Sequence, residues 1–272
     1  MATQHQFWSR QPPGACPPGP LARTLFPELR LLWNAPVWKR DIVTGQNGDW
    51  TGISGSLSLP PTIDGTGLAL PDGVAGAALS FSSRPTGTQP KITLFGALHT
   101  KTTSGAIQIV VATSFISGGG HSMKLNSSGT TLTASKPGVA DSGSLTLDVN
   151  TPYVWIYSHD EATDAYWLMA RNLLNGKTVS TSGTDTTTAS ACGGTYLIGG
   201  QDDGTRPCTS PIMMIGIAEN FVPQAVGYAF LDTPWHVFAR PSDTRAAAAA
   251  AAYVFNPLSG RGGAAAQPLA VH

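Results

Sequence analysis

Between residues 41 and 240, short runs rich in β-branched and aromatic residues alternate with polar turns, a pattern typical of antiparallel strands. We expect strands at 91–97, 106–113, 121–125, 130–134, 144–149, 153–159, 165–172, 177–181, 195–198 and 211–219. The helical period is almost absent, and one short helix is predicted at 223–230, with Pro223 near its first turn. Many short strands with close turns predict an all-β fold, an antiparallel two-sheet jelly-roll sandwich of the lectin-like kind.

The turns between these strands carry their own signals. Asn175-Gly176 is the strongest hairpin signal in the chain, because both residue types tolerate positive φ. Residues 126–129 predict another short hairpin, and residues 160–164 predict a longer one in which the aspartates bond their own backbone.

Two segments of different composition flank the sandwich predicted at residues 41–240. Residues 1–40 form a Pro-rich apolar arm, and residues 241–272 form an Ala/Gly-rich tail. The apolar side chains of the arm either pad its own sandwich or dock on a neighbouring subunit, and the sequence leaves both interpretations open. The candidate inter-subunit contacts are Phe7, Trp8, Leu25, Phe26, Trp33, Tyr253 and Phe255.

Charge and hydropathy exclude several classes of partner. The chain has 272 residues, with 16 basic and 16 acidic residues, so the absence of a basic surplus argues against nucleic acid as a partner. No apolar window approaches the roughly 18 residues that span a membrane, and the first residues lack the core of a signal peptide. We expect a protein made in a cytoplasm that associates with copies of itself, since zero net charge favours association.

The three cysteines, Cys16, Cys192 and Cys208, have neither a disulfide framework nor zinc-ligand spacing. Cys192 and Cys208 bracket a Gly-rich stretch and are close enough in sequence to pair. Buried free thiols are the favoured interpretation, and the pairing stays open.

Candidate catalytic chemistry is sparse. Glycoside hydrolysis needs two facing carboxylates, yet none of the three glutamates has an acidic neighbour two or four places away on a predicted strand. A Gly-x-Ser-x-Gly turn is missing, and the six histidines are scattered without metal-ligand spacing. His236, next to Trp235, is expected to be packed or hydrogen-bonded rather than to act as a base. We therefore expect no enzyme, no catalytic residue, no metal and no cofactor.

A carbohydrate or calcium site is the one binding site that the sequence suggests. Lectin-like sandwiches hold sugars with Asp, Asn and aromatic residues in loops, and such oxygen ligands suit calcium. The alternative is that these residues simply form polar turns. The candidates are Asp202, Asp203, Asn220, Asp160 and Asp164.

Six segments follow one another in an order found in one group of jelly rolls. They are residues 41–48 (DIVTGQNG), 78–81 (ALSF), 153–157 (YVWIY), 175–179 (NGKTV), 196–200 (YLIGG) and 234–238 (PWHVF). Together they resemble the laminin-G-like, concanavalin-A-like jelly rolls of tailed-phage structural proteins, and the final Pro-Trp-x-x-Phe favours phage over animal members. The stretch from residue 54 to residue 90 departs from the family pattern.

This resemblance implies a structural protein of a tailed-phage virion, made in the host cytoplasm. The arm and tail favour a capsid decoration or cement protein that binds the major capsid protein or other virion proteins. The alternatives are a tail or fibre component, or a lectin-like module that binds a glycan on the host surface.

Overall fold

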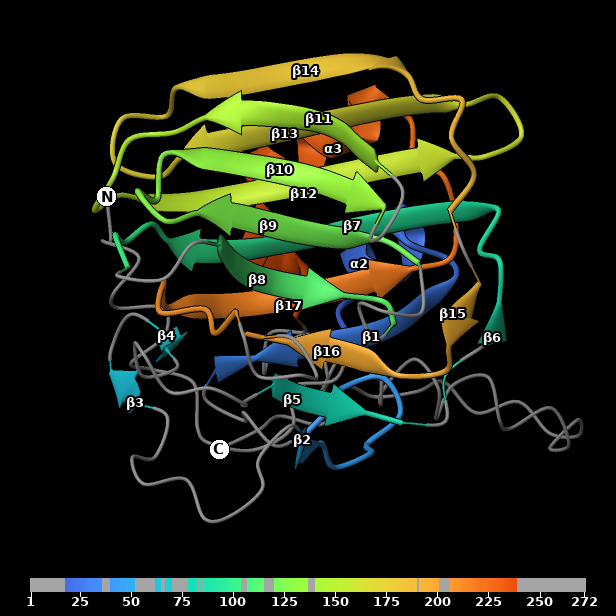
Figure 1. The fold of residues 1–272 in the computed structure, drawn as a ribbon, viewed down its shortest axis with the longest axis horizontal. Helices are drawn as coiled ribbons and strands as arrows, with labels where there is room; N and C mark the ends of the chain where they lie inside the picture. The colour runs from blue at the N-terminus through green and yellow to red at the C-terminus, as the bar shows by residue number, and fades with distance from the viewer. Residues whose placement is uncertain are drawn as a thin grey trace, which may run out of the picture.

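A computed structural model describes residues 18–35, 40–51, 62–64, 67–69, 78–82, 84, 86–103, 107–114, 120–136, 140–189, 191–200 and 206–238. In this part of the chain two antiparallel sheets pack face to face, as Figure 1 shows. The predicted fold class, an all-β two-sheet sandwich, is confirmed.

The first sheet has the strand order β14-β13-β12-β7-β17-β4-β3, and β1 also pairs with β17. Its strands are β1 (Leu29–Asn34), β3 (Thr62–Asp64), β4 (Gly67–Ala69), β7 (Lys91–His99), β12 (Pro152–Asp160), β13 (Ala165–Asn172), β14 (Thr178–Thr184) and β17 (Ile212–Ala218). The strands β7, β12 and β17 at its centre read as almost continuous apolar runs, because both faces of this sheet are covered.

The second sheet has the strand order β11-β10-β9-β8-β16-β5-β2. Its strands are β2 (Asp49–Thr51), β5 (Ala78–Phe81), β8 (Ile107–Ala112), β9 (Ser122–Asn126), β10 (Thr131–Lys136), β11 (Ala140–Thr146) and β16 (Tyr196–Ile198). A small ribbon pairs β6 (Thr86–Gly87) with β15 (Cys192–Gly193).

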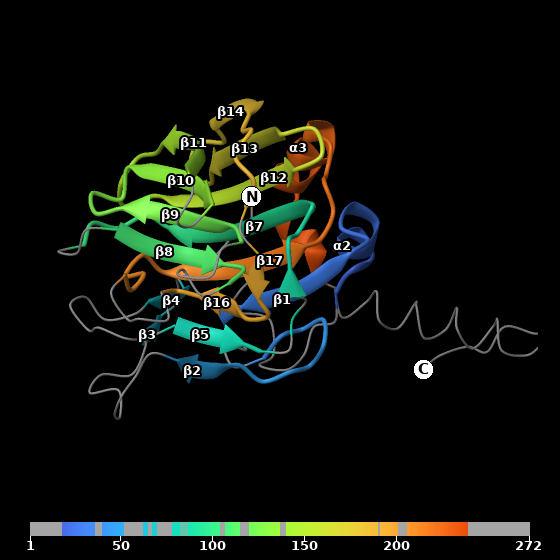
Figure 2. The same cartoon turned by 45° about the vertical axis from the view of Figure 1, so that its right-hand side comes forward.

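Short helices cover the outer face of the first sheet, as Figure 2 shows. They are α2 (Pro20–Leu25), α3 (Gln224–Asp232) and the 3-10 helix η3 (Pro234–Val237). Beneath them Phe26 stacks on Phe95 with ring centroids 4.2 Å apart, and Phe230 meets Phe95 edge-on at 5.0 Å. The first sheet thus separates two apolar cores, one between the sheets and one under the helices. The helix predicted at 223–230 is α3.

None of the helices in the described ranges is long and apolar enough to cross a membrane.

The sandwich begins earlier in the chain than residue 41. α2 and β1 come from the predicted arm, and the side chains of Phe26 and Trp33 are fully buried in the protein's own cores. Their predicted role as inter-subunit contacts is wrong, because a fully buried ring offers no surface to a neighbouring subunit. Leu25, a third predicted contact, is partly buried and packs against the outer core. Phe7, Trp8, Tyr253, Phe255 and the tail lie outside the described residues.

The segment at residues 41–48 owes its pattern to a buried carboxylate. Asp41 accepts hydrogen bonds from the backbone N–H of Leu32 at 3.1 Å and Val43 at 3.0 Å, and pairs with Arg84 at 2.8 Å. Gly45 turns the chain at φ 73°, and a side chain at Gly48 would collide with the core. The carboxylate therefore ties this loop to β1 and to the segment after β5.

Two local expectations need correction. The strand predicted at 144–149 is β11, which starts at Ala140, because polar bonds from Lys124 to Asp141 and from Ser142 to Asp185 hold its first residues in the sheet. At Asn175-Gly176 only the glycine has positive φ, at 76°.

The connection from β13 to β14 is therefore a longer loop than a two-residue hairpin. The Asn172 side chain orders it by accepting the N–H of Leu174 at 2.8 Å.

Replacing Gly176 with valine should lower the free energy of unfolding by about 1–2 kcal/mol, the usual cost of a left-handed backbone for a residue with a Cβ. No atom lies within 4 Å of the added Cβ, so sterics with neighbours add nothing. Urea unfolding measures the change, and Gly176→Asn is the control, because asparagine tolerates this conformation better. Equal stability of the valine variant would contradict the assigned turn.

Candidate functional site

A surface depression of about 370 Å³ lies where the end of β13, the loop after it and the α3–η3 segment meet. This size falls within the usual range for small-molecule sites. Side chains of mixed character line it, among them Arg171, Leu173, Asp232, Trp235 and His236.

The polar side of the depression is an ion pair. Arg171 on β13 pairs through Nη1 with Asp232 at the end of α3, and its Nε donates to Thr178 Oγ1 at 3.0 Å. The carboxylate of Asp232 is 60% exposed, so it keeps acceptor capacity for a ligand. Beside this pair, Trp235 of η3 packs partly on the outer core. The depression combines an aromatic wall with a donor and an acceptor.

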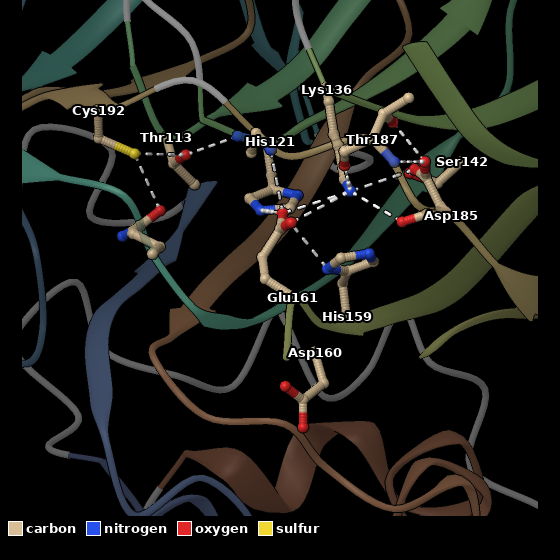
Figure 3. Close-up of polar contacts among 12 residues, drawn as sticks. Thr113, His121, Lys136, Ser142, His159, Asp160, Glu161, Asp185, Thr187 and Cys192 are labelled. Carbon is tan, nitrogen blue, oxygen red and sulfur yellow. Dashed lines mark hydrogen bonds and ion pairs between the residues drawn. The ribbon is translucent and has the colours of Figure 1, made fainter. Parts of the chain in front are cut away.

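A second polar site is buried between the sheets at the opposite end of β13, and Figure 3 shows it in close-up. Its side chains come from elements far apart in the sequence: His121 just before β9, Lys136 at the end of β10, His159 on β12, Glu161 directly after β12, and Asp185 directly after β14. We call these five residues the inter-sheet cluster.

Lys136 is the cation of the inter-sheet cluster, and its side chain is fully buried. Its Nζ lies 3.3 Å from Glu161 Oε1 and 3.3 Å from Asp185 Oδ2, and donates to the carbonyl oxygen of Thr187. Asp185 also accepts from Ser142 Oγ at 2.6 Å. Burial alone would raise the pKa of Asp185, but the hydrogen bonds from Ser142 and Thr187, together with the Lys136 charge, hold it well below its usual range.

The two histidines of the cluster are neutral at pH 7. Burial, followed by the charges of His159 and Lys136, lowers the pKa of His121 to about 3. Burial and then Lys136 lower the pKa of His159 to about 4. Neutral imidazole is the form that a metal ion binds.

Glu161 is the point where the histidines meet. Its Oε1 lies 3.5 Å from His121 Nε2 and 3.6 Å from His159 Nδ1, and the dashed lines in Figure 3 run from Glu161 to both rings. The ligand atoms of these three residues all lie within 4.8 Å of one another. Within the described ranges, they are the group of His, Cys, Asp and Glu side chains close enough to share a metal ion.

The sequence-based carbohydrate and calcium candidates do not assemble into this cluster. Figure 3 shows the Asp160 side chain pointing away from Glu161, because neighbouring residues of a strand face opposite sides, and it pairs with Lys91 at 3.4 Å. Asp164 sits in the turn after β12 at φ 57°, and its carbonyl oxygen accepts the N–H of Asp185. Asn220 follows β17, and its carbonyl oxygen accepts from Thr93 at 2.6 Å.

Asp202 and Asp203 lie outside the described residues.

Sequence reasoning missed the inter-sheet cluster. The expectation that the histidines are scattered is wrong for His121 and His159, whose ring centroids lie 5.4 Å apart. Glu161 faces the interior, with 9% of its side chain exposed. One signal was present: His159 and Glu161 are two residues apart at the end of a strand, and such residues share a face.

The two described cysteines, Cys192 and Cys208, are buried free thiols, as favoured from the sequence. Burial raises the pKa of the Cys208 thiol to about 12, so it is not a nucleophile at neutral pH.

Comparison with solved structures supports the fold class, whereas sequence comparison finds no match. No protein-family model matches the sequence, and no curated protein sequence matches it. Among solved structures, the Trypanosoma rangeli sialidase in complex with sialic acid matches 79% of this chain and 34% of its own, with 8% identity and a TM-score of 0.52. The chain thus spans about a third of that sialidase.

Two further structures match less closely. A GH54 α-L-arabinofuranosidase mutant has a TM-score of 0.44 and 11% identity over 65% of this chain and 45% of its own. The CBM40 of the Ruminococcus gnavus IT-sialidase, bound to α2,3-sialyllactose, has a TM-score of 0.38 and 10% identity over 57% of this chain and 95% of its own. At 8% identity the likeness to the sialidase shows the fold alone, and the protein is a lectin-like β-sandwich.

Replacing Lys136 with methionine should destabilise the protein by about 3–5 kcal/mol, because the carboxylates of Glu161 and Asp185 would lose their buried cation. The loss of stability should shrink as the pH falls, because Lys136 helps to hold the pKa of Asp185 low, and without it Asp185 takes up a proton more readily. Urea unfolding of both proteins at each pH measures it.

Lys124→Met is the matched control. Its partner Asp141 is 55% exposed, so we expect a loss below about 1 kcal/mol. A similar loss for the two variants would show that burial does not set the strength of the Lys136 pairs.

Proposed function

We propose that the protein is a lectin-like module that binds a glycan in the depression beside α3 and η3. The observation that carries the proposal is the arrangement of Trp235 next to the Arg171–Asp232 pair. A pyranose ring presents apolar C–H groups on one face and hydroxyls at its edge. An indole complements the face, and a guanidinium beside a carboxylate supplies a donor and an acceptor for adjacent hydroxyls.

The same arrangement favours a neutral sugar over an acidic one. Arg171 is already paired with Asp232, and a sugar carboxylate would have to displace that partner and then lie beside an exposed negative charge. The ligand class that suits the depression is therefore a neutral glycan with adjacent free hydroxyls.

Binding without catalysis is also part of this proposal. Asp232 is the one carboxylate among the described residues that line the depression, whereas glycoside hydrolysis uses two. Enzymes occur among the structural neighbours, but the likeness to them is one of fold.

Replacing Asp232 with asparagine should weaken glycan binding about 10- to 100-fold, because a hydrogen bond to a charged acceptor contributes about 1.5–3 kcal/mol. Trp235→Ala should weaken it at least as much by removing the apolar wall. The measurement is a glycan-array screen of the full chain with neutral and sialylated glycans, followed by calorimetry on the best ligand.

Tyr228→Ala is the control for the aromatic change, because Tyr228 is exposed on α3 and does not line the depression. Binding to no glycan, or equal affinity of Asp232→Asn and the unchanged protein, would overturn the proposal. Selective binding of sialylated glycans would overturn its assignment to neutral sugars.

A second candidate function is a structural component of a tailed-phage virion, located in the particle after synthesis in the host cytoplasm. Its support is the ordered resemblance of residues 41–240, above all residues 234–238, which form η3 and its flank. As a capsid decoration protein it would bind the major capsid protein and copies of itself, and as a tail or fibre component it would contact the host surface.

Quantitative mass spectrometry of purified particles should find this chain in a simple ratio to the major capsid protein if it decorates the capsid. A tail component should be present in a few copies or about a dozen, set by tail symmetry. Absence from particles would remove the virion hypothesis and leave the glycan proposal untouched.

A further inference from the structure

The inter-sheet cluster contains two buried imidazoles whose hydrogen-bonding capacity is not used. Within the described part of the chain, both ring nitrogens of His121 and both of His159 lack a hydrogen-bond partner. Buried polar groups in proteins are almost always paired, and each unpaired one costs about 1–3 kcal/mol. Two adjacent histidines in this condition point to a ligand that both rings share.

The distances from the Glu161 oxygen to the two imidazole nitrogens fit a small tetrahedral metal ion, and all three donor atoms lie within 4.8 Å of one another. Zinc lies about 2.0–2.2 Å from imidazole nitrogen and carboxylate oxygen, so two ligand atoms of a tetrahedral site are about 3.3–3.5 Å apart. The distances from Glu161 Oε1 to His121 Nε2 and His159 Nδ1 are 3.5 and 3.6 Å. These gaps are too long for hydrogen bonds, yet they match the edges of such a tetrahedron.

The balance of charged groups in the inter-sheet cluster also favours a bound cation. Glu161 and Asp185 are two anions, and Lys136 is the cation that contacts both of them within the described residues. Lys136 Nζ lies 3.3 Å from each carboxylate and also donates to the carbonyl oxygens of Asp185 and Thr187. The Asp185 carboxylate accepts further hydrogen bonds from Ser142 and Thr187, whereas Glu161 accepts one from the N–H of Ala189. A divalent ion on the histidine side of Glu161 would give this carboxylate a cation that it does not share with Asp185.

We propose that His121, His159 and Glu161 form a binding site for a divalent metal ion of the zinc class, with solvent as the fourth ligand. Two imidazoles and one carboxylate suit zinc, whereas calcium takes oxygen ligands almost exclusively. The ion joins the start of β9 in one sheet to the end of β12 in the other. Its role is structural, and it does not depend on glycan binding in the depression at the opposite end of β13.

The surroundings hold the three donors in place before metal arrives. Two hydrogen bonds to Thr113 fix the backbone of His121: its N–H donates to Thr113 Oγ1 at 2.9 Å, and its carbonyl oxygen accepts the Thr113 N–H at 2.9 Å. His159 lies within β12, paired in register on both sides. Glu161 is held by Lys136 and by the N–H of Ala189 at 3.3 Å. Such outer contacts orient ligands in metal sites.

The test uses the full chain without a polyhistidine tag, stripped with EDTA and titrated with Zn²⁺ by calorimetry. We expect one ion per chain, and a tetrahedral absorption spectrum when Co²⁺ replaces Zn²⁺. His121→Gln, His159→Gln and Glu161→Gln should each weaken Zn²⁺ binding at least 100-fold and abolish the Co²⁺ spectrum. His99→Gln, at the far end of β7, is the matched control and should bind like the unchanged protein.

A measurement on the unchanged protein keeps the test decisive where a variant fails to fold. X-ray absorption of the zinc-loaded chain should count two imidazoles with oxygen in the remaining positions. Zn²⁺ should also raise the Tm of the stripped protein, as any ligand specific for the folded state does. Absence of stoichiometric binding, a zinc shell without imidazole, or unchanged affinity in folded ligand variants would overturn the proposal.

Discussion

One buried ammonium group connects the two sheets at one end of the sandwich. Lys136 ends a strand of the second sheet, while its partners Glu161 and Asp185 follow strands of the first. A charge in the interior is tolerated only when paired, so β10 must end where both carboxylates are within reach. This requirement fixes how the second sheet lies over β12 and β14, a position that apolar contacts alone specify weakly because they have no direction.

The outer helices complete the fold on the other side of the first sheet. They turn a sheet with one buried face into one with two, which is why β7, β12 and β17 lack the alternation of a half-exposed strand. The Phe95 ring, which stacks on Phe26, lies directly against the backbone of Gly216 in the neighbouring strand β17. A Cβ at Gly216 would lie 2.0 Å from this ring, so the position requires glycine. The α3–η3 segment that finishes this layer also builds the wall of the depression.

The runs of β-branched and aromatic residues, together with the turn residues between them, were enough to predict the central strands, the helix α3 and the sandwich class. They failed for α2 and β1, because the prolines of the N-terminal segment indicate an extended arm while Phe26 and Trp33 in fact fill the cores. The inter-sheet cluster was unpredictable as a whole, since its five members come from four separate segments of the chain and only the strand register brings them together. Only the pair His159 and Glu161 was visible as a local pattern.

The inter-sheet cluster and the depression beside α3 and η3 lie at opposite ends of β13 and differ in their exposure to solvent. At one end of β13 the cluster is buried, and its Lys136 ion pairs join the two sheets. At the other end, after about 20 Å of strand, the side chain of Asp232 is exposed and that of its partner Arg171 is partly exposed. Residues 234–238, the segment that most favours the virion hypothesis, supply Trp235 to that edge. The glycan and virion hypotheses therefore meet in one segment: a particle component that contacts a host sugar would use the residues that also close the outer core.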